Sequence, residues 1–573
     1  MNLRRKQNGE VCIVLSGAAG QGIQTVEHVF TRIAKDSGFH VFATKEYMSR
    51  VRGGNNSTSI RISERPVKAY VDRIDILVPL NDNALERLRD RITSETIILG
   101  NEKYVRGERN ALVVNFEEIA ESFGNKIYEN SVAIGVLSGI IGAQEEALVK
   151  HITAYFSRKS EDVVKANVNA ALKGLEIGRT LGLRFELIPS QEVKSHYLMA
   201  GYEAVARGAI AGGCNFISSY PMSPATTVFT ELSRLSKEYG ILVDQAEDEI
   251  AAANMAIAAW YAGARALVST SGGGFALMTE AISLAGMIET PIVVHLGQRP
   301  GPATGLPTRT EQGDLNLVLH AGHGEFPRVI YAPGNLCEAY ELTARAFNIA
   351  DKYQIPVCVL TDQYFLDSFY NVETMPDAKI ERYVVKTDEN YRRYEITESG
   401  ISPRGIPGYG TGLVRVDSDE HDEYGHITES AQVRKRMVEK RLRKLKYMLE
   451  DSVPPKLFGP ENYEYLLVAW GSTQLVLKEA VELLNDELKL NIALLHFSQV
   501  YPVHPSITDF IEKARKTIFF EGNATGQFAN LLKLVFGIHT DERILKYDGF
   551  PFSVEEAVER ILGVVGRLRR EDE

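Results

Sequence analysis

Three acidic residues, Glu247, Asp248 and Glu249, stand together directly before a run of apolar residues. The run, residues 250–260, is rich in Ala, Ile and Met on every side, so we expect a buried helix there. An acid at the start of such a helix is favoured by the helix N-terminus and lies where burial shifts its pKa. A tuned carboxyl group of this kind suits proton transfer. An ordinary N-terminal charge cluster would give the same residues.

A hydroxyl group follows the end of one strand-like run. Residues 215–220 lead into the Pro-Met-Ser-Pro segment 221–224, which carries Ser223. Two prolines this close prevent a helix and fix the backbone of a turn. Ligands of open α/β sheets bind where strands end, so this turn is a candidate site; a stiff turn without a ligand is the alternative.

A guanidinium group follows a second strand-like run. Residues 291–298 form a buried strand whose end presents His295 and Arg299. The following segment, residues 300–309, is rich in Pro, Gly and Thr and suits one wall of a site for a small anion. A salt bridge made by Arg299 is the alternative interpretation.

Two glycine-bearing segments near the N-terminus suggest phosphate binding. Residues 10–18 form a strand, the loop contains Gly17, Gly20 and Gly22, and an amphipathic helix follows. The spacing is neither G-x-G-x-x-G nor a Walker motif, and a tight structural turn explains it equally well. Further on, Arg52 precedes a Gly-Gly turn, where guanidinium groups match phosphate oxygens; a solvated loop is the alternative.

Composition excludes several classes of protein. The chain has 573 residues, 44% of them hydrophobic, and a net charge of −11, which argues against a nucleic-acid-binding surface. No apolar run approaches the roughly 18 residues that cross a bilayer, and the N-terminus is no signal peptide. The four cysteines form no C-x-x-C pair, so we expect no metal or cluster in this chain and a reducing cytoplasm around it.

The alternation of strand and helix signals predicts an α/β protein with three α/β domains. Residues 386–460 interrupt the alternation and contain a helix from about residue 431 to 449. On this helix, apolar residues are expected to share one side and basic residues the other. The basic side is either a solvated face or a contact for an acidic partner. The apolar set is Val433, Met437, Leu442, Leu445 and Leu449.

From about residue 10 to residue 560 the chain resembles the alpha subunit of the 2-oxoacid:ferredoxin oxidoreductases, in the form with a gamma domain fused in front. The glycine loop and the Arg52 segment resemble the gamma domain. The segment 220–224 resembles a Y-P-I-T-P turn. Glu249 and Arg299 fall where the family has its thiamine-contacting glutamate and its substrate arginine.

The resemblance implies four segments. Residues 1–188 would be the gamma domain that contacts coenzyme A, and residues 195–385 the domain that binds the pyrimidine ring of thiamine diphosphate. Residues 386–460 would be a linker with an interface helix, and residues 461–573 a transketolase C-terminal-like domain.

The activity implied is the coenzyme A-dependent oxidative decarboxylation of a 2-oxoacid with reduction of ferredoxin, reversible in principle. The loop that ends at Thr308, followed by residues 311–314, resembles the 2-oxoglutarate enzymes, whose product is succinyl-CoA. Enzymes for pyruvate, branched-chain or aryl 2-oxoacids remain alternatives. A coenzyme A-binding scaffold subunit without catalysis is a further one.

The resemblance also implies roles for individual residues. Glu249 would hydrogen-bond the ring nitrogen N1′ of thiamine, with Glu247 as the fallback, and Tyr220 and Pro221 would contact the cofactor. Ser223 would donate at the reacting centre. The substrate carboxylates would contact Arg299, helped by Thr308, with Arg309 a candidate for the second one. Coenzyme A would meet Gly17, Gly20, Gly22 and Arg52.

Two departures from the family pattern carry consequences. Ser223 stands where the family usually has Thr, so the hydroxyl is kept with a freer rotamer. The chain also lacks cluster cysteines and a G-D-G…N segment for the diphosphate–magnesium group. We therefore expect a separate beta subunit to bring Mg²⁺, the diphosphate site and at least one [4Fe–4S] cluster. The active form would be an (αβ)₂ heterotetramer that reduces ferredoxin.

Overall fold

The computed structural model describes residues 9–48, 54–183 and 185–572. The chain forms two compact units, each described here by itself. The first contains Met1–Ala200, Asp367–Thr374 and Ser553–Ala557, and the second contains Gly201–Leu366, Met375–Phe552 and Val558–Glu573. The predicted domain boundaries differ from this division and stay predictions.

The first unit is built on an eight-stranded mixed sheet with the strand order β6-β5-β4-β1-β3-β2-β14-β7. The central strand β1 is buried along almost its whole length; it pairs antiparallel with β3 and parallel with β4. The strands are β1 (Glu10–Ala18), β2 (His40–Glu46), β3 (Asn55–Ser63), β4 (Ile76–Pro79), β5 (Ile97–Gly100), β6 (Ala111–Val113), β7 (Tyr197–Ala200) and β14 (Phe369–Val372).

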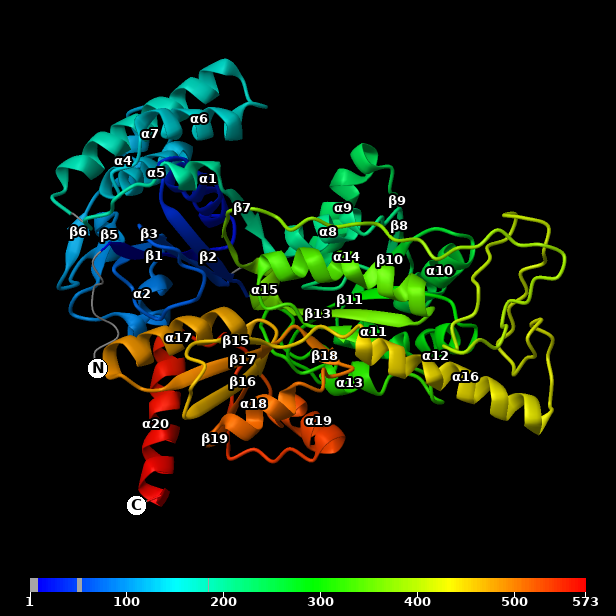
Figure 1. The fold of residues 1–573 in the computed structure, drawn as a ribbon. Helices are drawn as coiled ribbons and strands as arrows, with labels where there is room; N and C mark the ends of the chain where they lie inside the picture. The colour runs from blue at the N-terminus through cyan, green and yellow to red at the C-terminus, as the bar shows by residue number, and fades with distance from the viewer. Residues whose placement is uncertain (1–8, 49–53, 184, 573) are drawn as a thin grey trace. The chain divides into compact units, whose positions relative to one another are not determined.

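Most helices of the first unit lie on one side of this sheet, and α2 lies on the other (Figure 1). The amphipathic helix α1 follows β1 and buries its Ile, Val and Phe side chains. The helices are α1 (Ile23–Asp36), α2 (Asn83–Arg87), α3 (Glu102–Val105), α4 (Phe116–Glu121), α5 (Glu129–Ile140), α6 (Glu145–Phe156) and α7 (Glu161–Thr180).

Helices α5 and α7 approach so closely that only glycine fits between them. A Cβ atom on Gly135 of α5 would lie 2.0 Å from the carbonyl oxygen of Ala171, and one on Gly178 of α7 would lie 2.2 Å from that of Val136. Because the opposing atoms are backbone, they cannot move aside without shifting a helix. The absence of side chains therefore sets the separation of these two helices.

Replacing Gly135 with alanine is expected to destabilise the protein by about 1–3 kcal/mol, since the added methyl group overpacks a rigid contact. Thermal unfolding would show the lower melting temperature. Gly563→Ala is the control: this glycine is also helical, but nothing lies within 4 Å of its added Cβ atom. An unchanged melting temperature for Gly135→Ala would contradict the close-packing argument.

The second unit contains a seven-stranded sheet with the order β18-β12-β13-β11-β10-β8-β9. All neighbouring strands are parallel except the β12–β18 pair. The strands are β8 (Phe216–Ser219), β9 (Leu242–Gln245), β10 (Ala266–Thr270), β11 (Ile292–Gln298), β12 (Val329–Tyr331), β13 (Pro356–Asp362) and β18 (Gln499–Tyr501). Parallel strands buried on both faces explain the near-continuous apolar runs of β11 and β13.

Helices connect the parallel strands of this sheet, as right-handed crossovers require. Helix α10 starts immediately after its N-cap Asp248, whose side chain accepts a hydrogen bond from the amide of Ala251 at 2.7 Å. The helices are α8 (Gly201–Ala211), α9 (Thr226–Tyr239), α10 (Glu249–Tyr261), α11 (Gly272–Leu277), α12 (Thr279–Met287), α13 (Leu315–Leu319), α14 (Leu336–Tyr353) and α15 (Gln363–Asp367).

A five-stranded sheet with the order β15-β17-β16-β19-β20 completes the second unit. Its strands are β15 (Lys456–Phe458), β16 (Tyr465–Trp470), β17 (Ile492–Phe497), β19 (Lys516–Glu521) and β20 (Glu542–Leu545). Its helices are α17 (Thr473–Leu488), α18 (Ile507–Lys513), α19 (Gln527–Phe536) and, from Val558 onward, the C-terminal α20 (Val554–Asp572), whose first turn belongs to the first unit. The three sheets confirm the predicted α/β fold class.

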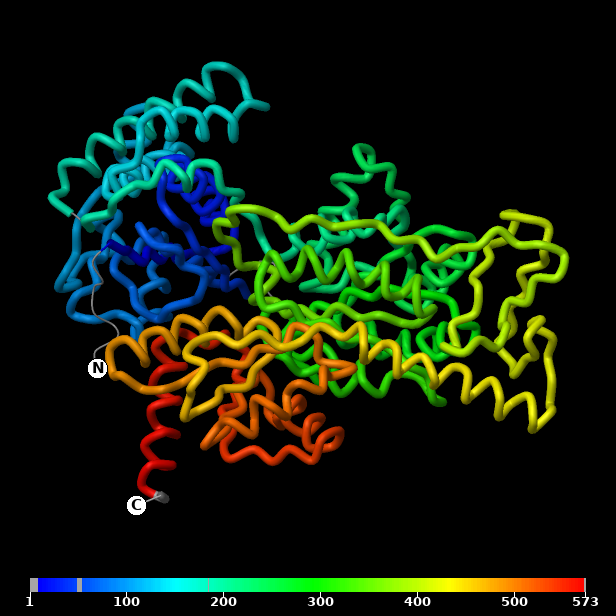
Figure 2. Tube along the Cα trace, in the orientation of Figure 1, coloured from blue at the N-terminus to red at the C-terminus, as the bar shows by residue number. Residues whose placement is uncertain are grey.

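The segment between β14 and helix α16 (Ala431–Glu450) contains none of the named helices or strands, and Figure 2 shows it as a long irregular trace. Helix α16, which follows this segment, is anchored through buried charges, and here the sequence interpretation was wrong. Lys440 and Lys444 are fully buried, and each ammonium group lies 2.6 Å from the carboxylate of Glu289. Leu442, which was expected on the apolar side, is exposed.

The described residues include no helix that is both long and apolar enough to cross a bilayer.

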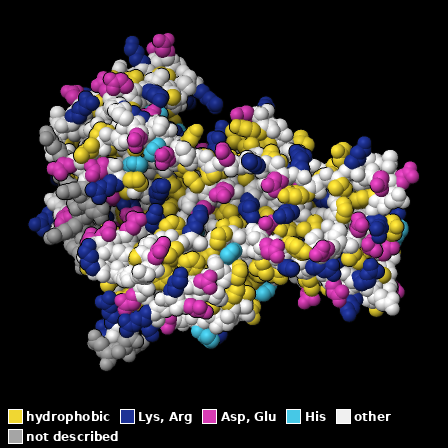
Figure 3. Space-filling view, viewed as in Figure 1, with side chains coloured by type: hydrophobic (Ala, Val, Ile, Leu, Met, Phe, Trp, Pro, Cys, Tyr) yellow, Lys and Arg dark blue, Asp and Glu magenta, His cyan; other side chains and the backbone are white. Residues whose placement is uncertain are grey.

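On the face shown in Figure 3, acidic and basic side chains are interspersed. Cys12, Cys214 and Cys358 are buried, and Cys337 is half-buried.

Candidate functional site

Four adjacent parallel strands of the seven-stranded sheet place the predicted site residues of the second unit at one edge. The order β9-β8-β10-β11 is continuous in the sheet. Helix α10 follows β9, the turn 220–224 follows β8, the triple glycine 272–274 follows β10, and Arg299 follows β11. Because the carboxyl ends of parallel strands point the same way, all four segments lie at the edge where α/β proteins bind ligands.

Glu249 is the first residue of α10, and its side chain is buried, with 4% of the residue exposed. Among the described residues, its Oε1 atom is buried and has no hydrogen-bond partner. The neighbouring Glu247 is exposed. A buried carboxylate oxygen without a partner is costly, so Glu249 is prepared for a donor that the described part of the chain does not supply.

The triple glycine forms the floor of the site. A Cβ atom on Gly274 would lie 2.7 Å from Glu249 Oε1, and one on Gly272 would lie 2.5 Å from Asp314 Oδ1. At Gly273 the nearest atoms are 3.9 Å away, in Met222 and in the loop that follows Arg299. Only glycine leaves room for the two carboxyl groups at the ends of this segment and for a ligand above its middle.

The turn 220–224 and Arg299 are joined through the main chain. Arg299 Nη1 donates a hydrogen bond of 2.7 Å to the carbonyl oxygen of Ser223, and the Ser223 side chain is exposed. Tyr220 is also exposed, and Pro221 is half-buried. Burial lowers the pKa of Arg299, opposed by the charge of Asp314, and the guanidinium group stays cationic.

The loop 300–309 lies next to a loop of the five-stranded part of the same unit. The guanidinium group of Arg309 lies over the ring of Phe550, 4.5 Å from its centroid, and Arg309 also packs against Gly549. Thr308 is half-buried in the same loop.

A hydrogen-bond chain inside the sheet supports the turn, and sequence reasoning missed it. His295 is fully buried within β11 and is not presented at its end. Thr361 Oγ1 lies 2.8 Å from its Nε2, and Ser269 Oγ lies 2.9 Å from its Nδ1. Ser269 donates its single proton to the carbonyl oxygen of Ala225 at 3.1 Å, so His295 Nδ1 must donate to Ser269. Burial lowers the pKa of His295 to about 3, so the ring is neutral.

Two further acids were missed because their position depends on a loop. Burial raises the pKa of Asp314 to about 6, although the positive charge of Arg299 acts in the opposite direction. The pKa of Glu311 is raised to about 7 by burial and then by the charge of Asp314. In the sequence, the Glu-Gln-Gly-Asp segment was noted only as part of a family resemblance. No periodicity or motif spacing in the sequence predicts that Asp314 of this segment lies against Gly272.

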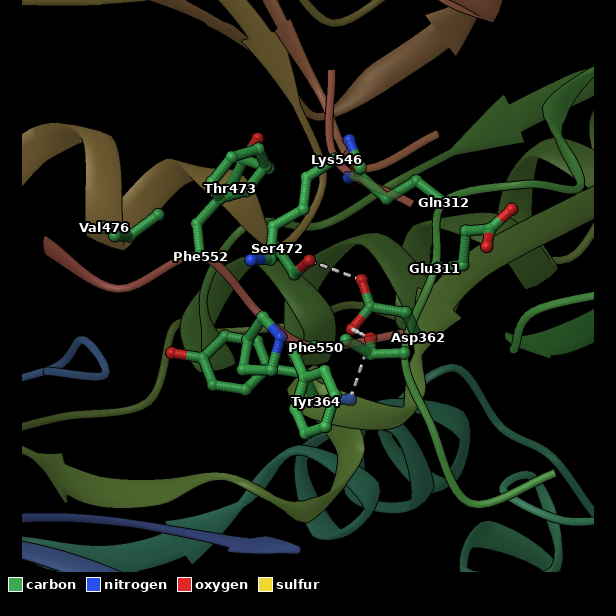
Figure 4. A pocket seen from close by; sticks show the side chains of 13 residues that line it. Glu311, Gln312, Asp362, Tyr364, Ser472, Thr473, Val476, Lys546, Phe550 and Phe552 are labelled. Carbon is green, nitrogen blue, oxygen red and sulfur yellow. Dashed lines mark hydrogen bonds between the residues drawn. The ribbon is translucent and has the colours of Figure 1, made fainter. Parts of the chain in front are cut away.

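A small pocket lies between the seven-stranded and five-stranded parts of the second unit (Figure 4). Asp362, at the end of β13, accepts hydrogen bonds from the hydroxyls of Ser472 and Thr310 in this pocket. The carboxylate of Glu311 points away from Asp362. The buried Asp362 therefore already has its hydrogen-bond donors, unlike Glu249 beside the triple glycine. Aromatic side chains, including Tyr364, Phe550 and Phe552, line the pocket as well.

The glycine loop of the first unit forms as predicted between β1 and α1. Gly22 is the N-cap of α1 with a φ of 80°, where the side chain of Asn130 leaves no space for a Cβ atom. Gly20 has a φ of 90° and no atom within 4 Å of an added Cβ, so its position is open. Gly17 lies in β1 against Gln21. Arg52 lies outside the described residues.

The structure thus collects Tyr220, Pro221, Ser223, Glu249 and Arg299 at one sheet edge, with Thr308 and Arg309 in the loop that follows. The glycine loop belongs to the first unit and is a separate feature. Asp314 and Ser271 are additions from the structure, and His295 moves from the strand end, where the sequence placed it, into the interior of β11. Ser271 is fully buried, and its hydroxyl has no partner among the described residues.

Two family models match the chain. One, described as "Pyruvate flavodoxin/ferredoxin oxidoreductase, thiamine diP-bdg", covers residues 207–440. The other, described as "Pyruvate ferredoxin/flavodoxin oxidoreductase", covers residues 12–177. The first includes every predicted site residue of the second unit.

Full-length relatives support the same assignment. The 2-oxoacid:ferredoxin oxidoreductase subunit alpha of Sulfolobus sp is 32% identical over 96% of this chain and 96% of its own length. The 2-oxoglutarate oxidoreductase subunit KorA of Mycobacterium tuberculosis is 27% identical over 96% of this chain and 91% of its own length. A solved structure, 2-oxoglutarate:ferredoxin oxidoreductase from Magnetococcus marinus with 2-oxoglutarate, coenzyme A and succinyl-CoA bound, matches with a TM-score of 0.91. That match has 30% identity and covers 97% of this chain and 100% of that chain.

Proposed function

Because the chain belongs to the 2-oxoacid:ferredoxin oxidoreductases, as an alpha subunit, we propose that it acts on 2-oxoglutarate. The reaction is the coenzyme A-dependent oxidative decarboxylation to succinyl-CoA and CO₂, with reduction of ferredoxin. The choice of 2-oxoglutarate is supported by the names of the KorA relatives and by the ligands of the Magnetococcus marinus structure. The observation that carries the catalytic role is the buried, unpartnered carboxylate oxygen of Glu249 beside Gly274.

The residues at the sheet edge fit the pyrimidine end of thiamine diphosphate. Glu249 Oε1 lacks a donor, Ser271 offers a second buried polar atom, and the triple glycine leaves space above its middle. A flat ring with several nitrogen atoms can supply the hydrogen-bond partner that Glu249 Oε1 lacks. Thiamine supplies the electron sink for decarboxylation when it is bound.

Glu249 then serves to hold a proton at the ring nitrogen N1′ of the cofactor. Its burial at a helix N-terminus keeps water away from this hydrogen bond, which is stronger in such surroundings than in water. The carboxyl group is oriented by its close approach to Gly274. Glu247, being exposed, is the weaker candidate for this role.

Arg299 is proposed to bind the substrate carboxylate next to the oxo group. Arg299 Nη1 donates to the Ser223 carbonyl, which holds the guanidinium group next to residue 223. The exposed Ser223 hydroxyl would donate to the reacting centre. Thr308 would assist Arg299. Arg309 remains the candidate for the second carboxylate, although its stacking on Phe550 already occupies one face of the guanidinium group.

In the first unit, we assign the glycine loop with Gly17, Gly20 and Gly22, and Arg52, to coenzyme A. The open position at Gly20 and the start of α1 at Ile23 give backbone amides room to meet a phosphate. In this proposal the acyl acceptor thus binds through a different unit from the 2-oxoacid.

A beta subunit is proposed to complete the site and to carry Mg²⁺, the diphosphate site and the [4Fe–4S] cluster, in a cytoplasmic (αβ)₂ heterotetramer that reduces ferredoxin. Large apolar side chains close in sequence to the site segments are exposed, which supports a covering partner. They include Leu242, Ile250, Met255, Leu277 and Leu306.

The proposal is tested by co-expressing the chain with its candidate beta subunit and assaying ferredoxin reduction with a panel of 2-oxoacids and coenzyme A. We expect no turnover by the chain alone and the highest kcat/KM for 2-oxoglutarate in the complex. A preference for pyruvate, a branched-chain or an aryl 2-oxoacid would overturn the substrate assignment. A complex that binds coenzyme A and decarboxylates nothing would overturn the catalytic one.

A further inference from the structure

Asp314 is a buried acid at the site that the proposed chemistry leaves without a role. Its Oδ2 atom is buried and has no hydrogen-bond partner among the described residues. Elsewhere in the second unit a buried acid is compensated: Asp351 pairs with Arg265 at 3.1 Å and with Arg404 at 2.6 Å. An uncompensated carboxylate favours its neutral form, so Asp314 is a group poised to bind a proton.

The charges around Asp314 are few and come from two loop residues. Arg299 attracts its carboxylate, and Glu311 repels it. The other segments against it bring neutral groups: the backbone of Gly272, Gln298, whose Oε1 accepts from the Asp314 amide at 3.1 Å, and Gln527, which donates to the carbonyl oxygen of Gly313. Arg299 is therefore the cation that stabilises the ionised form of Asp314.

We propose that binding of the 2-oxoacid carboxylate to Arg299 drives the uptake of one proton from solvent by Asp314. The inference rests on the proposed function, which places that carboxylate on Arg299. An incoming negative charge offsets the attraction of Arg299, the one cation that acts on this acid among the described residues, and adds repulsion at it. Protonation of Asp314 removes this repulsion, and the neutral carboxyl group gains an O–H that can donate a hydrogen bond in the site.

The coupling has a definite sign. In the free protein the pKa of Asp314 is about 6, so at pH 7 the group is mostly ionised. Bound substrate raises that pKa further, so the protonated form binds substrate more tightly. The dissociation constant therefore increases with pH, by up to about tenfold per pH unit between the pKa values of the free and bound states. Glu311, with a pKa of about 7, is the group most able to compete for this proton.

Isothermal titration calorimetry of the assembled complex tests the proposal. The probe is N-oxalylglycine, a 2-oxoglutarate analogue whose oxo group is an amide carbonyl and therefore a poor electrophile. Titrations at pH 7 in phosphate and in Tris, whose ionisation enthalpies differ, report the protons taken up. We expect roughly half a proton or more per site in the wild type. In Asp314→Asn the uptake should nearly vanish, and the dissociation constant should lose most of its dependence on pH.

Two variants separate the neighbouring acids. Glu311→Gln should keep most of the uptake, and Glu325→Gln, which removes an exposed carboxylate, should keep all of it. Wild-type binding without proton uptake would overturn the inference and leave the proposed function standing. Uptake that persists in Asp314→Asn and disappears in Glu311→Gln would overturn the assignment to Asp314. A complex that neither binds the analogue nor turns over 2-oxoglutarate would instead overturn the proposed function.

Discussion

Replacing Glu249 with glutamine in the assembled complex is expected to lower the rate of 2-oxoacid decarboxylation by about 10²- to 10⁴-fold, the usual contribution of a positioned acid or base. Glutamine has the same size, so the packing against Gly274 is kept and only the capacity to hold a proton is lost. The measurement is ferredoxin reduction under saturating 2-oxoglutarate and coenzyme A. Size-exclusion chromatography would show whether the complex still assembles.

The matched control is Glu247→Gln. This acid lies two positions earlier in the same cluster but is exposed, so its loss should change the rate by less than about twofold. If Glu249→Gln worked at a near-normal rate while Glu247→Gln did not, the assignment of the catalytic acid would move to Glu247. Equal, near-normal rates for both variants would exclude this acidic cluster from catalysis altogether.

Replacing Glu289 with glutamine is expected to lower the free energy of unfolding by about 3–5 kcal/mol, because it leaves buried cations without a counter-charge. The carboxylate lies 2.6 Å from the ammonium groups of both Lys440 and Lys444, and all three side chains are buried. Thermal unfolding should show a melting temperature of the second unit lower by roughly 4–7 °C. The segment between β14 and α16 should become more sensitive to protease, since α16 anchors its end.

Glu439→Gln on the same helix is the control for charge removal. Its pair with Lys435 spans 3.9 Å at the exposed surface and should contribute less than about 0.5 kcal/mol. The pH dependence gives a second test. Lys440, Lys444 and Arg393 hold the pKa of Glu289 well below its ordinary 4.5. Its stabilising contribution is thus present above pH 4.5 and is lost as the pH falls below that value. A Glu289→Gln variant as stable as the wild type would contradict both expectations.

The fold class followed from the sequence because strand and helix periods alternate and because the segments that end strands carry Gly, Pro or an N-cap. The start of α16 at Ala431 agrees with the expectation. The burial of Lys440 and Lys444 could not be predicted from helical periodicity, which assigns lysine to solvent. It depends on Glu289, which lies about 150 positions away in the sequence and has a positive φ of 49°.

At the site, the sequence identified the residues that directly follow strands, because a strand end has a fixed place in a parallel sheet. Glu249, Ser223 and Arg299 are of this kind. Asp314 lies in an irregular loop, so its approach to Gly272 is a tertiary contact that no local pattern encodes. His295 was expected at the strand end and is instead a neutral, hydrogen-bonded residue within the sheet. The alternation of residues along a strand does not predict how deeply a polar side chain is buried.

The bond between Arg299 and the Ser223 carbonyl has a consequence for how this family can change. A carbonyl oxygen is present whichever side chain residue 223 carries, so the arginine keeps its anchor when serine and threonine are exchanged there. The identity of the side chain at residue 223 and the position of the Arg299 guanidinium group are thus not linked through this bond. Lineages can exchange one hydroxyl amino acid for the other at this turn without a compensating change at the arginine.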